Sequence, residues 1–124
     1  MNQGYVPCFA RYNSSSYSLD PIYADNTTLE RTKKLMSELL EANGQFELKQ
    51  LLGQDIKPMR RGKSSEMDRV LKLINFPEGT PLRIDYGKNK FRVILGLSNE
   101  ARGRIAYIFM ISNDHKDFDG KQKK

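Results

Sequence analysis

The pattern of apolar and polar residues along the chain changes near residue 80. Before that point, apolar residues recur every three or four positions, which is typical of amphipathic helices. After it, apolar residues alternate with polar ones or run continuously, as they do in strands. The sequence therefore predicts helices first and a sheet afterwards.

The clearest helix is expected over residues 27–42. It opens with Thr27 and, three residues later, Glu30, which is the spacing of a capping box. The pair Asn43-Gly44 is a typical helix stop. One apolar stripe runs along this segment, made of Leu29, Leu35, Met36, Leu39 and Leu40. We expect that stripe to be buried.

Two shorter helices are expected after it. The first covers residues 45–53 and ends at Gly53, and the second covers residues 66–75 and ends before Phe76-Pro77. Ser65 and Asp68 repeat the capping-box spacing at the start of the second one. The segment between these helices, QDIKPMRRGK, contains a proline and a glycine and is expected to be a connector. The apolar face of the last helix consists of Met67, Val70, Leu71 and Ile74.

Three antiparallel strands are expected over residues 82–86, 91–97 and 104–112. The last contains IAYIFMI, which is apolar on both faces, as in a central strand. The first two strands each have one apolar face, which we expect to pack against the helices. Its residues are Leu82, Ile84, Tyr86, Phe91, Val93, Leu95 and Leu97. The opposite face, which we expect to be open, carries Arg83, Asp85, Arg92 and Ile94.

This order of elements predicts an α+β fold, with N-terminal helices packed on one face of a small antiparallel or mixed sheet. A chain of 124 residues is long enough for one modest core. Residues 1–25 sustain neither period and are expected to be an irregular N-terminal arm, with one short strand near Tyr5–Arg11. Residues 26–124 are expected to form a single domain.

Composition excludes several classes of protein. No apolar run approaches the roughly 20 residues of a membrane helix, and the N-terminus lacks the basic and apolar regions of a secretory signal. The single cysteine, Cys8, fits a reducing compartment. One cysteine and one histidine do not suffice for a classical zinc site. We therefore expect a cytoplasmic protein with no metal, no cofactor and no membrane partner.

The net charge of +6 favours a polyanion as partner, and the charges are clustered. The run KPMRRGK contains Lys57, Arg60, Arg61 and Lys63 and no acidic residue. A second cluster, Lys121, Lys123 and Lys124, closes the chain. The alternative is a basic surface that is merely solvated.

Arg83 and Arg92 are expected on one face of neighbouring strands, where alternate side chains lie close together. Two arginines at such a place need an anionic partner or open water. Ion pairing with Asp85 and exposure to solvent is one interpretation. Together with the nearby basic run, the two arginines predict a face that binds phosphate.

The last third of the chain carries a recognisable combination of motifs. PLRIDYGKNKFRVILGL is followed by a strongly apolar strand and then by ISNDHKDF, which holds His115, the only histidine. Over about Thr80 to Gly120 the chain resembles the RelE/ParE superfamily of toxins from type II toxin–antitoxin systems. Its ending, with His115, Asp117 and Phe118, looks most like the RelE/YafQ branch of mRNA interferases.

The resemblance implies an endoribonuclease that cuts mRNA, usually on the ribosome, without a metal. In this chain Arg83 and Arg92 would correspond to phosphate-contacting arginines, His115 to a proton-transfer group, and Phe118 to an aromatic that positions a base. The expected RNA-binding residues are Lys57, Arg60, Arg61, Lys63, Lys116 and Phe118. The implied partners are RNA, most often mRNA on the ribosome, and a cognate acidic antitoxin.

The residue types suit this chemistry. Histidine, with a free pKa of about 6.5, can transfer protons near neutral pH, and arginine can stabilise charge on phosphoryl oxygens. A second proton-transfer group is needed, for which the sequence offers Lys116, Asp117 and Tyr86. The alternative interpretation of His115 is a surface histidine at the end of a strand.

Two other functions remain open at this point, because one fold serves many activities. The first is a non-enzymatic interaction protein of the same fold, such as a gyrase-directed toxin or a phage-encoded host inhibitor. The second is a simple nucleic-acid-binding module that uses the basic run.

Overall fold

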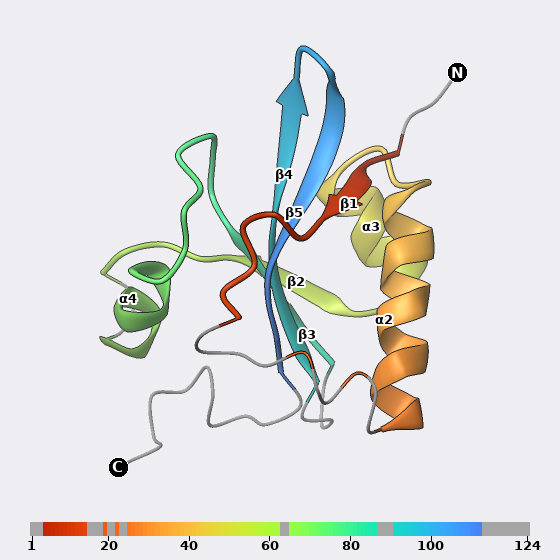
Figure 1. The fold of residues 1–124 in the computed structure, drawn as a ribbon, viewed down its shortest axis with the longest axis horizontal. Helices are drawn as coiled ribbons and strands as arrows, with labels where there is room; N and C mark the ends of the chain where they lie inside the picture. Colours follow the sequence, from red (N-terminus) through yellow and green to blue (C-terminus); the bar gives the residue numbers. More distant parts are fainter. Residues whose placement is uncertain are drawn as a thin grey trace.

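The computed structural model describes residues 4–14, 19, 22, 25–62, 65–86 and 91–112. Three helices within these ranges, shown in Figure 1, are α2 (Asn26–Leu39), α3 (Gln45–Leu52) and α4 (Ser65–Leu71). The strands are β1 (Val6–Cys8), β2 (Asp55–Pro58), β3 (Leu82–Asp85), β4 (Arg92–Glu100) and β5 (Gly103–Ser112). They form one mixed sheet, so the predicted α+β fold is confirmed.

The order of strands in the sheet is β1-β5-β4-β3-β2. β3, β4 and β5 form the expected antiparallel meander, and β1, the short strand expected in the arm, pairs parallel to β5. β5 therefore has a neighbouring strand on each side and is an interior strand of the sheet, as its sequence predicts. The first and last strands of the described chain thus lie next to each other.

Helices α2 and α3 cover one face of this sheet, as expected. Leu35 and Leu39 of α2 and Leu48 of α3 are fully buried in one cluster with residues of the strands. The strand residues of that cluster include Leu82, Ile84, Tyr86, Phe91, Val93 and Leu95. Alternation along β3 and β4 therefore predicted the correct inner face.

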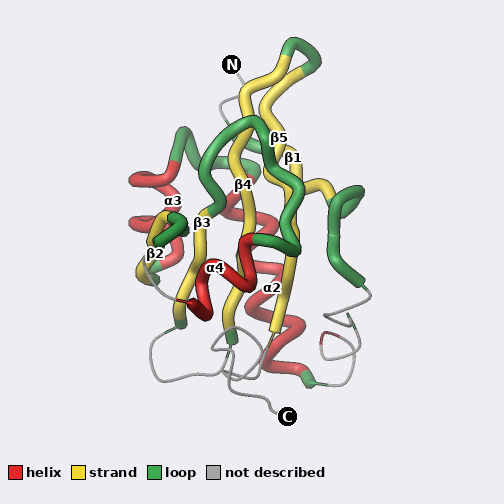
Figure 2. The backbone as a smooth tube through the Cα atoms, turned by 90° about the vertical axis from the view of Figure 1, so that its left-hand side faces the viewer, coloured by secondary structure: helices red, strands yellow, loops and turns green. Residues whose placement is uncertain are grey.

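The other face of the sheet is not open, which corrects the expectation. Met59, Val70 and Phe76 cover it and form a second buried cluster with Ile94, Tyr107, Phe109 and Met110 of β4 and β5. Figure 2 shows α4 and α2 on opposite sides of the strands. Strands that are apolar on both faces need cover on both, and the stripe of α4 supplies part of it.

Phe76 packs very closely against β4. A Cβ atom placed on Gly96 would lie 2.7 Å from the Phe76 ring, so only glycine leaves room for the ring at this distance. Phe109 meets the same ring edge-on, with centroids 5.5 Å apart. The position of Phe76 is therefore fixed from two sides.

Tyr12, in the segment that follows β1, binds the end of β5. Its hydroxyl donates to the Ile111 carbonyl at 3.3 Å and accepts from the Ile111 amide at 3.0 Å. One side chain thus satisfies both backbone groups of Ile111, as a neighbouring strand would. The N-terminal segment therefore holds β5 one residue before its end.

Three local expectations differ from the structure. The N-cap of α2 is Asp25. Its carboxylate accepts hydrogen bonds from the Thr27 amide at 3.1 Å and from the Thr28 hydroxyl at 2.8 Å. The expected capping box of Thr27 and Glu30 is therefore wrong. The connector contains a strand, β2, at the sheet edge, where proline is tolerated. α4 ends at Leu71, before the predicted residue 75.

In the described part of the chain, no helix has the length and apolarity needed to cross a membrane.

Candidate nucleic-acid interface

The strand register brings three cations together at one end of the sheet. Lys57 of β2 lies opposite Arg83 of β3, and Asp85 of β3 lies opposite Arg92 of β4. Arg83 and Asp85 are two residues apart, so they share a face. We call Lys57, Arg83 and Arg92 around Asp85 the cation cluster.

All three cations of the cation cluster lie within ion-pair distance of one carboxylate. Arg83 Nε lies 3.1 Å and Arg92 Nε 3.4 Å from Asp85 Oδ1, and Lys57 Nζ lies 4.0 Å from Asp85 Oδ2. The Arg83 and Arg92 side chains are only 22% and 13% exposed. Ion pairing with Asp85, the simpler interpretation of the two arginines, is therefore confirmed, whereas their free exposure to solvent is not.

Among the described residues, Asp55 adds a second carboxylate beside the cation cluster. It pairs with Lys57 at 3.6 Å and also with Lys49 at 3.6 Å. Asp85 Oδ1 is buried and accepts no well-aligned hydrogen bond from the described residues, although its Oδ2 accepts one from Arg83 at 3.2 Å. The cluster is therefore held largely by charge, and an anion could share its cations.

The end of β5 lies beside the cation cluster. Ser112, the last residue of β5, is the register partner of Arg92. The chain continues from there to His115, three residues later. The predicted residues Lys63, His115, Lys116, Asp117 and Phe118 lie outside the described residues.

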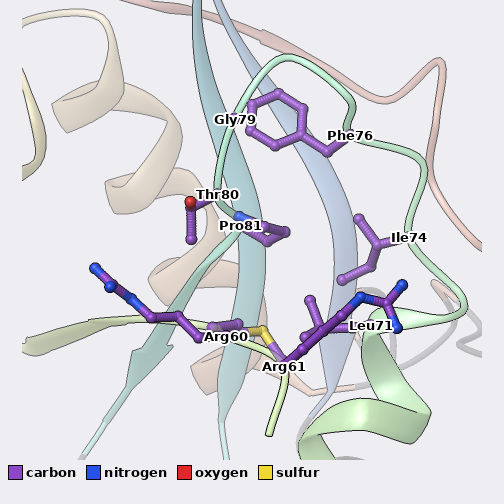
Figure 3. A pocket seen from close by; sticks show the side chains of 9 residues that line it. Arg60, Arg61, Leu71, Ile74, Phe76, Gly79, Thr80 and Pro81 are labelled. Carbon is purple, nitrogen blue, oxygen red and sulfur yellow. The ribbon is translucent and has the colours of Figure 1, made fainter.

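Arg60 and Arg61, which follow β2, line a pocket of about 430 Å³ that we call the connector pocket. Its other lining residues are Met59, Leu71, Ile74, Phe76, Gly79, Thr80 and Pro81. Figure 3 shows the two arginine side chains diverging at one end of this pocket and the Phe76 ring toward the other. Within the described ranges, neither guanidinium has an ion-pair partner, so both remain available to a ligand.

Tyr86, one of the candidates for the second proton-transfer group, does not belong to this interface. It is 6% exposed and lies in the cluster beneath α2 and α3, on the face away from the cation cluster. Burial raises the pKa of its hydroxyl to about 12. This placement argues against Tyr86 as an acid or base, and Lys116 and Asp117 remain as candidates.

A second polar site lies near the β4–β5 turn, in a cavity of about 600 Å³. Arg11 forms a bidentate pair with Glu78 at 2.7 and 2.8 Å and lies 3.9 Å above the Tyr107 ring. The Tyr107 hydroxyl donates to Glu100 at 2.6 Å. Arg102 pairs with Glu100 at 3.2 Å, so two cations meet two carboxylates among the described residues of this site. The network therefore ties the N-terminal segment to the segment before β3 and offers no excess charge there to a ligand.

Sequence reasoning missed the apolar half of the connector pocket. The sequence pattern assigns Leu71 and Ile74 to a buried helix stripe, and Phe76 to a helix stop. Only the arginines gave a signal, because the apolar residues have the same pattern as core residues. No group of three or more His, Cys, Asp or Glu side chains suited to a metal occurs within the described ranges.

Comparison with protein-family models, with curated proteins and with solved structures finds no match for this chain. The structure itself gives a small α+β fold, with helices and a five-stranded mixed sheet.

Proposed function

We propose that the protein is a toxin-type endoribonuclease that cleaves mRNA in the cytoplasm without a metal, in the manner of the RelE/YafQ branch. One observation carries this proposal. Arg83 and Arg92 both contact Asp85 at the end of the strand ladder, and Ser112, the register partner of Arg92, is three residues before the only histidine. Three residues of chain reach at most about 10 Å, so His115 can meet a phosphate bound at the cation cluster.

The proposed reaction is a transesterification. The RNA 2′-hydroxyl attacks the adjacent phosphorus, the new P–O2′ bond forms, and the P–O5′ bond breaks. One group takes the proton from the 2′-hydroxyl and another gives a proton to the leaving 5′-oxygen. His115 serves as one of these groups, with Lys116 or Asp117 as the other. Arg83 and Arg92 stabilise the additional charge on the phosphoryl oxygens.

The basic residues outside the cation cluster extend the proposed contact with RNA. Arg60 and Arg61 lie directly after β2 and have no ion-pair partner within the described ranges. Together with Lys57, Lys63, Lys116 and Phe118 they would hold the strand on either side of the cleaved bond. A cognate antitoxin of acidic character would bind the same positive surface and block it.

The test is cleavage of RNA by purified protein in EDTA, on and off the ribosome, together with growth arrest in cells. His115→Ala should leave folding nearly intact and lower cleavage by roughly 100-fold or more, the usual scale for losing a positioned acid or base. Arg83→Ala should also lower cleavage. Lys33→Ala, an exposed change on α2, serves as the control. Full activity of His115→Ala would rule out its catalytic role.

A second function, binding nucleic acid without cutting it, is favoured by a different observation. Arg83 and Arg92 are mostly buried and already meet Asp85, whereas Arg60 and Arg61 are available. Salt-dependent RNA or DNA binding by a wild-type protein that cuts neither would support this function. Growth arrest with neither cleavage nor nucleic-acid binding would instead indicate a non-enzymatic interaction protein.

A further inference from the structure

We infer that the connector pocket takes up one unpaired base of a single-stranded RNA, while Arg60 and Arg61 bind phosphates next to that base. This inference rests on the RNA-binding role proposed above and adds the form of RNA that the protein selects. It concerns a place distinct from the cation cluster, where the phosphate to be cut would bind.

The walls of the connector pocket suit a flat ring. Leu71, Ile74 and Pro81 line it together with Phe76, and Figure 3 shows Ile74 and Pro81 on opposite sides of the space beside the Phe76 ring. A volume of about 430 Å³ lies within the usual range for small-ligand sites. Apolar and aromatic walls bind bases of any sequence, because every base has a π-face.

The pocket is also firm enough to recognise a shape. Phe76 packs against Phe109 and into the space left by Gly96. Met59 is 3% exposed, and its amide donates to the Pro81 carbonyl at 2.9 Å. These contacts tie the two sides of the pocket to the sheet. Because the pocket is already formed, less binding free energy is lost to ordering its walls when a ligand binds.

The charges at the pocket call for an anion. Arg60 and Arg61 lack ion-pair partners within the described ranges, in contrast to Arg11, Arg83 and Arg102, which all meet carboxylates. Thr80, exposed and also part of the lining, can exchange hydrogen bonds with the polar edge of a base. An anion with an aromatic group, such as a nucleotide, matches both the cations and the apolar walls, whereas an acidic peptide matches only the cations.

The connector pocket and the cation cluster both adjoin the β2 edge. Lys57 and Met59 are two residues apart along the β2 edge, so their side chains point to the same face. Arg60 and Lys57 also line a neighbouring cavity of about 460 Å³ with Pro58 and Met67. One strand of RNA can therefore pass from the cluster to the pocket. A duplex cannot, because its bases are paired and stacked inside the helix.

The experiment measures binding of fluorescein-labelled RNA by anisotropy, in EDTA, with 2′-O-methyl RNA to prevent cleavage. The RNAs are an eight-nucleotide single strand, its duplex, and the same strand with abasic positions at its centre. We expect wild type to bind the intact strand at least fivefold tighter than the abasic strand and tighter than the duplex, because each stacked base adds to affinity.

The matched variants are Thr80→Glu and Thr27→Glu. Both residues are exposed, both changes add one negative charge, and Thr27 lies on α2, away from the pocket. Thr80→Glu should weaken binding of the intact strand at least tenfold, since its carboxylate competes for Arg60 and Arg61, and it should reduce the preference for intact over abasic RNA. Thr27→Glu should stay within twofold of wild type.

The outcomes separate this inference from the proposed function. Equal binding of intact and abasic strands by wild type overturns the inference, even if unmodified RNA is still cut. A preference for intact strands without cleavage of unmodified RNA supports the inference and removes the enzymatic proposal. No binding of any of these RNAs by wild type overturns the inference and leaves an acidic peptide as the better ligand for the pocket, whereas the proposed function is decided separately by cleavage on the ribosome.

Discussion

At the residue scale, Tyr86 is a polar group in an apolar place. Its hydroxyl is buried and has no hydrogen-bond partner among the described residues. Tyr86→Phe should therefore leave the free energy of unfolding unchanged or raise it by up to about 1 kcal/mol at pH 7, because it removes a buried polar group without a partner. Urea denaturation measures this. Tyr107→Phe, which loses the bond to Glu100, should instead be destabilising.

The same residue makes stability depend on alkaline pH. An unfolded tyrosine has a pKa near 10, whereas burial raises that of Tyr86 to about 12. Between these values the unfolded state loses its proton first, so wild type should lose stability as the pH rises from about 10 to 12. In Tyr86→Phe that part of the loss should be absent. If wild type and Tyr86→Phe lose stability in parallel between about pH 10 and 12, Tyr86 is not the source of this pH dependence.

Glu78 shows the opposite dependence. The hydrogen bonds from Arg11 lower the pKa of its carboxyl to about 2, below its ordinary value of about 4.5. The pair with Arg11 therefore adds stability above about pH 4.5, and this is lost as the pH falls toward 2. Glu78→Gln should be less stable than wild type at pH 7, with a difference that shrinks between pH 4.5 and 2. Glu41→Gln, an exposed change just after the end of α2, serves as the matched control.

At the scale of elements, the connector is a strand followed by two available arginines. Replacing Arg60 and Arg61 with alanine should weaken RNA binding and flatten its dependence on salt. The logarithmic slope should fall by about 0.7 for each phosphate of a single strand that the arginines no longer neutralise. Lys33→Ala with Lys34→Ala removes the same charge from α2 and serves as the control. An unchanged slope after the arginine substitutions would show that the connector does not touch RNA.

The elements also show which features a sequence pattern can predict. Alternation over β3 and β4 predicted the inner face, and the place of Arg83 and Arg92 on the other one, because side-chain direction in a strand follows from position alone. Strand β2 was not predicted from the sequence, because four residues that include a proline show too little alternation of apolar and polar positions. The cover on the second face of the sheet was not predicted either, because the apolar stripe of α4 does not indicate which face of the sheet it packs against. The connector pocket draws its lining from several segments that only the fold brings together.

At the scale of the whole molecule, the N-terminal segment and the end of β5 form one unit. Tyr12→Phe removes the hydroxyl that binds both backbone groups of Ile111. The Ile111 amide should then exchange its hydrogen about fivefold faster, as expected for the loss of a hydrogen bond worth about 1 kcal/mol. The Ile108 amide, in the middle of β5, should keep its rate. Equal changes at both positions would indicate general destabilisation and no specific tie.

The pairing of β1 with β5 also fixes the order of events during synthesis. Residues near the start of the chain find their partner only when residues 105–107 have been made. Contacts so distant in sequence form late and slow the folding of a domain. A nascent chain can form its helices early, but its sheet stays unfinished, and Arg92 lacks the neighbour that β5 supplies, until β5 has left the ribosome. A chain shorter than this therefore carries Arg92 at the edge of an unfinished sheet.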